Sequence, residues 1–153
     1  MPMRALLDSF CSIPELCGSP IWASGDGPSV RTVQNWVTRL GLPRHKRGRL
    51  VWFQENEVYS FLIQECLVCP RESRAVIFEA IKKANPPQLV SFYKLPQLPI
   101  WTASSVPSER TLRKWISEGT IAYFRIGHTL YFQERAVRLS LGYQEASALV
   151  QAA

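Results

Sequence analysis

The chain has few of the residues on which catalysis depends. Its 153 residues include only two histidines, His45 and His128. It has no Gly-rich phosphate loop, no His-x3-His pair, no Ser/His/Asp arrangement and no cluster of carboxylates. The sequence therefore assigns no chemistry to this chain and predicts no cofactor, and an enzyme is the weakest of the functional hypotheses.

Long apolar runs are also missing. Nowhere do 18 apolar residues follow one another, and the first eight residues contain no long apolar stretch. Membrane spanning and secretion therefore lack support in the sequence. We expect a cytoplasmic protein with no membrane among its partners.

What the chain does have is one pattern written twice. Residues 20–62 align without a gap on residues 99–141, and fourteen of these 43 positions are identical. Chance does not produce such a match. Upstream, the match resumes after three extra residues, 17–19, so each unit is expected to span about 50 residues. The repetition predicts two copies of one small domain.

All four cysteines, Cys11, Cys17, Cys66 and Cys69, lie in the first half. The Cys66-x2-Cys69 spacing is found in zinc knuckles, but Pro70 follows it directly and the second copy keeps the pattern without any cysteine. We expect reduced, partly buried thiols and no metal site, and zinc binding stays open as the alternative.

The charge balance favours a polyanionic partner. Lys and Arg outnumber Asp and Glu by 18 to 12, and each 43-residue block carries six basic and three acidic residues. Basic side chains gain affinity for nucleic acid by displacing counterions from phosphate. The alternative is that this positive charge only keeps the protein soluble and binds no partner.

Each copy contains the signals of an amphipathic helix. Ser29 and Ser108 follow a proline and can cap a helix N-terminus with the hydroxyl oxygen. After each serine, apolar residues recur at helical spacing and place Trp36 and Trp115 on an inner stripe. The opposite face is polar and basic, with groups that reach phosphates and base edges.

A hairpin is expected after each helix, because Gly48 and Gly127 separate two β-prone runs. The first tip, residues 44–49, is strongly basic, whereas the second tip, residues 123–128, is not. We expect both histidines at these tips, without metal. A further helix is expected to begin at Gln54-Glu55 and at Gln133-Glu134.

These signals predict an α+β fold, mostly helical, with two tandem units. The first covers 9–68, a connecting helix and linker cover 69–90, and the second covers 91–153. One-turn helices started by proline are expected at 13–16 and 95–98, and a tail helix over 143–152. The apolar face of the connecting helix at 71–84 is expected to pack on its own protein, with self-association as the alternative.

The motif Ser108-Glu-Arg-Thr-Leu-Arg-Lys-Trp-Ile-Ser-Glu-Gly119, followed by Arg125-Ile-Gly127, resembles winged helix-turn-helix domains of the MerR and excisionase type. The first copy, with Ile13-Pro-Glu-Leu16 ahead of Pro28 and a basic hairpin, is also similar to Mu-type DNA-binding domains of phage transposases and repressors. The resemblance implies two winged helix-turn-helix units that bind DNA without catalysis, and a phage or mobile genetic element as the source.

A helix fits the major groove, and a basic hairpin can act as a wing that enters a minor groove. We expect base reading by four helix residues and phosphate contacts by two first-turn arginines, with the remaining contacts spread over helix and hairpins. The expected DNA-binding residues are Arg31, Gln34, Asn35, Arg39, Arg44, Lys46, Arg47, Arg49, Arg110, Arg113, Lys114, Arg125 and His128, of which Gln34, Asn35, Arg113 and Lys114 read bases and Arg31 and Arg110 clamp phosphates.

The leading hypothesis is a sequence-specific double-stranded DNA-binding protein that reads a bipartite site. It would serve as an excisionase-like recombination accessory factor, with a recombinase or transposase as partner, or as a transcription regulator. A two-fold relation between the copies would place the helices about 34 Å apart, whereas a tandem relation would read a direct repeat. The alternative is a protein-protein interaction module with Trp22, Trp101, Tyr123 and Phe124 at its surface.

Overall fold

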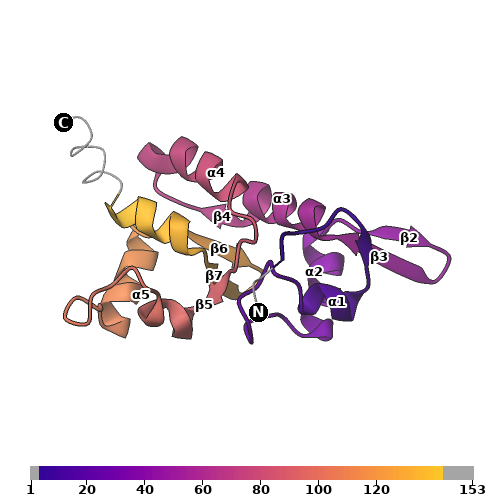
Figure 1. The fold of residues 1–153 in the computed structure, drawn as a ribbon, viewed down its shortest axis with the longest axis horizontal. Coiled ribbons are helices and arrows are strands. Elements are labelled where there is room, and N and C mark those ends of the chain that lie inside the picture. Colours follow the sequence, from indigo (N-terminus) through magenta and orange to yellow (C-terminus); the bar gives the residue numbers. More distant parts are fainter. Residues whose placement is uncertain (1–3, 143–153) are drawn as a thin grey trace.

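The two copies of the repeated pattern fold in the same order of elements (Figure 1). The computed structural model describes residues 4–142. The first repeat contains β1 (Phe10–Cys11), α1 (Ile13–Cys17), α2 (Val30–Leu40), β2 (His45–Arg47), β3 (Leu50–Gln54) and α3 (Glu55–Cys66). The second contains β5 (Val90–Ser91), η2 (Phe92–Gln97), α5 (Glu109–Glu118), β6 (Tyr123–Ile126), β7 (Thr129–Phe132) and a helical stretch at 134–142. The α+β class is confirmed.

The structure corrects the expected alignment upstream of residue 20. Ser12 and Ser91 are the N-cap residues of α1 and η2, and Cys11 pairs with Phe53 as Val90 pairs with Phe132. All of these equivalences keep the register of 79 residues that relates 20–62 to 99–141. The three-residue insertion expected at 17–19 is therefore wrong, and the ungapped repeat begins at β1 and β5.

The indole groups confirm this register. Trp22 Nε1 donates to the Leu16 carbonyl oxygen at 3.0 Å, and Trp101 Nε1 donates to the Leu95 carbonyl oxygen at 3.0 Å. The expected one-turn helix with proline at its start occurs only in the first repeat. In the second, Pro96 lies inside the 3-10 helix η2, because the chain starts to turn at Phe92 and reaches this proline a turn later.

The helix starts predicted from serine are confirmed. Ser29 Oγ accepts from Thr32 N at 3.1 Å and Ser108 Oγ accepts from Thr111 N at 3.1 Å, so each hydroxyl satisfies a free amide of the first turn. Gly41 and Gly119 end these helices at positive φ, 74° and 72°, where a glycine costs least. The two helices are thus bounded by the same local signals.

The chain between the repeats joins them into one body. β4 (Leu67–Val68) pairs with β6, which gives the second repeat a sheet of order β4-β6-β7-β5, while the first repeat has the sheet β1-β3-β2. One buried core contains Phe53 and Leu62 of the first repeat together with Phe124 and Ile126 of the second. The repeats therefore share apolar packing.

The connecting helix was expected over 71–84, and residues 71–82 form η1 (Arg71–Ser73) and α4 (Arg74–Lys82). Its apolar face packs on its own protein, as predicted: Ile77 and Ile81 are fully buried, and the Tyr59 hydroxyl donates to the Ile81 carbonyl oxygen at 2.6 Å. The tail helix expected at 143–152 lies outside the described residues.

One acidic residue is buried beside this core. Glu55 is 1% exposed, and Arg4 donates to both of its carboxylate oxygens at 2.6 and 2.8 Å. Burial pushes the pKa of Glu55 up, but the hydrogen bonds from Arg4, Ser19 and the Leu7 amide outweigh burial and hold that pKa below its ordinary value. This pair ties the N-terminal segment to the start of α3.

The second hairpin points at the first repeat. A Cβ on Gly127, at the tip of β6–β7, would lie 3.3 Å from Trp36 Nε1 of α2, whereas a Cβ on the equivalent Gly48 would meet nothing within 4 Å. Tyr131 packs its ring 4.9 Å from that of Trp22 and donates its hydroxyl to the Asp26 carbonyl oxygen at 3.0 Å. Both hairpins run toward the same end of the molecule (Figure 1). The repeats are therefore arranged head to tail.

This arrangement predicts unequal effects of two equivalent substitutions. Gly48 and Gly127 have nearly the same φ, 63° and 64°, so alanine costs about 1–2 kcal/mol of left-handed strain at either position. Only Gly127→Ala also pushes on Trp36, which adds about 1 kcal/mol. Urea unfolding of the two variants measures the difference, and equal losses would contradict the contact between hairpin and α2.

Candidate nucleic-acid interface

The outward face of α2 is polar and without negative charge. Trp36 and Val33 turn inward and are buried, while Arg31, Gln34, Asn35 and Arg39 are all exposed. No acidic residue occurs between Val30 and Leu40. The helix therefore presents two guanidinium groups and two amide side chains to solvent, which are groups that bind phosphates and base edges.

The outward face of α5 differs because it carries its own counter-charges. Arg110, Arg113 and Lys114 are exposed, but Arg113 contacts the Glu109 carboxylate at 2.9 Å and its guanidinium lies 4.6 Å from the centre of the Phe92 ring. Lys114 lies 3.9 Å from Glu118. Of the four expected base-reading residues, only Gln34 and Asn35 are free of such ion pairs in the described chain.

The first hairpin and the residue just before it carry a cluster of cations. Arg44, Lys46, Arg47 and Arg49 are exposed, and none forms an ion pair with residues 4–142. His45 was expected at the tip of the hairpin, and this prediction is wrong. His45 lies opposite Trp52 in the strand pair, and its Nε2 atom is 3.2 Å from the Glu57 carboxylate. The pairing register of β2 and β3, with Gly48-Arg49 as the turn, is the reason for this placement.

A hollow of about 340 Å³ brings together predicted residues from both repeats. Asn35 and Arg39 of α2 line one side, and His128 at the tip of the second hairpin lines the other. Thr32 and Thr129, which were not among the expected DNA-binding residues, add hydroxyl groups to the same hollow. Only the contact between the repeats creates this site.

A second hollow, of about 270 Å³, lies between α5 and its own hairpin. Arg113 and Arg125 line it together with Ser117 and the buried Tyr123. The structure therefore groups nine of the expected residues into a hollow beside α2, a hollow beside α5 and the cationic first hairpin. The other four line neither hollow and lie on the outward faces of the two helices: Arg31, Gln34, Arg110 and Lys114.

Eight of the expected residues share one electrostatic property. Each is exposed and, among the described residues, none has an ion-pair partner: Arg31, Arg39, Arg44, Lys46, Arg47, Arg49, Arg110 and Arg125. Because no carboxylate of the described protein binds these cations, none competes with phosphate for them. Their attraction to a polyanion is therefore not reduced by an ion pair that must first break. These eight side chains are the electrostatic basis of the candidate interface.

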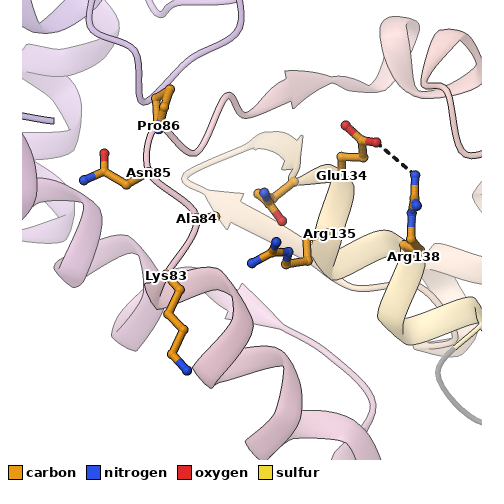
Figure 2. A pocket seen from close by; sticks show the side chains of 8 residues that line it. Lys83, Ala84, Asn85, Pro86, Glu134, Arg135 and Arg138 are labelled. Atoms are coloured by element: carbon orange, nitrogen blue, oxygen red, sulfur yellow. Dashed lines mark hydrogen bonds and ion pairs between the residues drawn. The ribbon is translucent and has the colours of Figure 1, made fainter. Parts of the chain in front are cut away.

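A further hollow, of about 470 Å³, lies away from these groups, between the end of α4 and the helical stretch at 134–142 (Figure 2). Lys83 and Arg135 line it, while Arg138 turns to Glu134 at 3.1 Å. In Figure 1, α4 runs along one edge of the molecule and α5 lies toward the opposite edge. The cations around α4 therefore form a separate group.

The cysteines form no site with other ligand residues. No group of three or more His, Cys, Asp or Glu side chains within 4–142 is placed to hold a metal ion. All four thiols are free of disulfides. Burial raises the pKa of Cys11 and that of Cys66 to about 11, so both thiols carry their proton at neutral pH.

The aromatic residues named for a protein-binding surface lie mostly inside. Trp22, Tyr123 and Phe124 are buried, and Trp101 is half-buried, because they belong to the repeated core. Two aromatic side chains among residues 4–142 are instead exposed, Phe10 and Tyr93. Phe10 lies beside the first hairpin and packs on His45 at 5.1 Å and on Trp52 at 6.1 Å between ring centres. The sequence pattern placed Phe10 in the upstream part of the repeat and gave it no role at a binding surface.

No family model, curated protein or solved structure matches this chain. In the part of the chain that the structure describes, no helix combines the length and the apolar character needed to cross a bilayer.

Proposed function

We propose that this protein binds double-stranded DNA through two winged helix-turn-helix units joined head to tail. The observation that carries the proposal is the set of eight exposed cations on α2, α5 and the two hairpins that have no ion-pair partner within residues 4–142. In each unit the N-capped helix would lie in the major groove and the hairpin would act as the wing.

The first unit is the stronger candidate for base reading. Gln34 and Asn35 are exposed amide side chains, and such groups form paired hydrogen bonds with adenine in the major groove. The tip of the second hairpin flanks α2 beside Asn35 and Arg39. The wing of the second unit would therefore contact the backbone next to the groove that α2 occupies.

To bind DNA, the second unit would have to exchange ion pairs within the protein for contacts with DNA. Arg113 must leave Glu109 to reach phosphate or a guanine edge, and the carboxylate beside it repels the backbone. We expect a smaller contribution to affinity from α5 than from α2. A head-to-tail order of the units corresponds to a bipartite site made of two half-sites in the same orientation.

This function requires neither a cofactor nor a catalytic residue in the chain. A protein that places two linked domains on DNA can organise a recombinase or transposase on its site, as an excisionase-like accessory factor does, or can occupy an operator as a transcription regulator. In either role, any chemistry on the DNA would come from the partner.

Replacement of both amide side chains, Gln34→Ala with Asn35→Ala, tests the base-reading role. Binding to the preferred duplex is expected to weaken on the order of 10²-fold, since each base contact contributes about 1–3 kcal/mol, while binding to unrelated duplex stays the same. Fluorescence anisotropy with both duplexes measures this difference. Equal weakening on the two duplexes would refute base reading by α2.

A further inference from the structure

The contact between the repeats has a docking side and a receiving side. The second repeat docks with Leu89, which is fully buried and exchanges backbone hydrogen bonds of 2.7 Å with Ile21 and Ala23, and with Gly127 and Tyr131 of its hairpin. The first repeat receives these groups on Trp22 and Trp36, which are 2% and 5% exposed. All of these positions have equivalents 79 residues away.

The equivalent docking side of the first repeat is open. Phe10 stands where Leu89 stands in the second repeat, yet it is 57% exposed. Trp52, the equivalent of Tyr131, is half-buried, and Gly48 faces free space where Gly127 meets an indole. Phe10 and Trp52 thus form an open surface, whereas the equivalent residues of the second repeat, Leu89 and Tyr131, are buried against the first repeat.

The equivalent receiving side of the second repeat is open as well. Trp101 and Trp115 are half-buried, and their ring centres lie 6.3 Å apart at an interplanar angle of 33°. The covered pair, Trp22 and Trp36, has ring centres 5.7 Å apart at 45°. A similar pair of indoles is therefore available, with Trp115 on α5, and α5 lies at the end of the molecule opposite the first hairpin (Figure 1).

The charges at the two open sides are complementary. In the internal contact, His128 of the hairpin shares a hollow with Arg39 of α2. The same repeat register replaces His128 by Arg49 and Arg39 by Glu118. A second copy docked in the manner of the internal contact would bring the Arg49 guanidinium to the Glu118 carboxylate, which lies 3.9 Å from Lys114.

We propose that the first hairpin and Phe10 of one molecule dock on Trp101, Trp115 and Glu118 of a second copy, and so repeat between chains the contact made within each chain. The two surfaces differ and lie at opposite ends, so the interface is heterologous and leaves one free surface of each kind. Association therefore continues beyond the dimer. This inference does not depend on DNA binding.

Sedimentation velocity of the nucleic-acid-free, full-length protein tests the proposal, at concentrations from about 10 μM to about 1 mM, the range suited to a small, transient interface. The weight-average mass is expected to rise steadily past that of a dimer, and Phe10→Ala is expected to shift this rise to at least tenfold higher concentration. A wild-type protein that stays at 17.4 kDa, or that stops at the dimer, would overturn the proposal.

Charge exchange identifies the surfaces. Arg49→Glu and Glu118→Arg place like charges together, so each variant alone is expected to remain monomeric. Mixing the two variants, or combining both changes in one chain, restores opposite charges and is expected to restore association. Arg71→Glu, an exposed change of the same charge on η1, serves as control and is expected to associate like wild type. Association of either single variant at wild-type strength, or failure of the mixture to associate, would refute the assignment.

Discussion

Simultaneous replacement of Arg44, Lys46, Arg47 and Arg49 by alanine is expected to weaken binding to every duplex on the order of 10²-fold at about 150 mM salt. These four side chains are exposed on the first hairpin and have no ion-pair partner among the described residues. Each phosphate contact contributes about 0.9 to the slope of log K against log salt. Titrations at several salt concentrations should therefore also give a slope whose magnitude is smaller by about 3.6.

A variant with the same change in charge provides the control. Arg71, Arg74, Lys83 and Arg135 are exposed cations on η1, on α4, directly after α4 and in the helical stretch at 134–142. Their replacement by alanine is expected to change affinity less than threefold, because these elements do not contact the DNA in the proposed complex. Equal losses in the two variants would show that net charge alone governs binding.

The second large effect concerns stability. Trp36→Ala is expected to lower the free energy of unfolding by about 4 kcal/mol. Trp36 is 5% exposed and packs its ring 5.7 Å from Trp22 and 6.4 Å from Tyr131. Its loss therefore opens a cavity where the two repeats meet, and urea unfolding followed by far-ultraviolet circular dichroism measures the cost.

The matched control is Trp115→Ala, at the equivalent position of the second repeat. Trp115 is half-buried and packs on Trp101 with ring centres 6.3 Å apart, without a hairpin against it. A loss of about 2 kcal/mol is expected there. If Trp36→Ala and Trp115→Ala lowered the free energy of unfolding by the same amount, packing between the repeats would not be what makes Trp36 important for stability.

The elements that sequence predicts well are those encoded by local signals. Ser29 and Ser108 mark helix starts because a hydroxyl oxygen can accept an amide of the next turn without help from distant residues. Gly48 and Gly127 mark hairpin turns for an equally local reason, since their φ is positive. The same reasoning identified the exposed polar faces of both helices.

Relations between distant segments could not be predicted in this way. The strand pairs made by β1 and β5 hold two residues each and carry little sequence identity, so the register upstream of residue 20 became clear only from Ser12, Ser91 and the indole hydrogen bonds. The meeting of His128 with Arg39 depends on how the repeats pack, and no pattern within one repeat encodes it.

Selection of binding sites from a random duplex library, with the full-length protein at about 150 mM salt, tests the central claim most directly. At this salt concentration non-specific binding is already weakened. The account predicts enrichment of two half-sites in the same orientation, as head-to-tail units require. An inverted repeat would contradict the arrangement of the units, and no enrichment at all would contradict sequence-specific DNA binding.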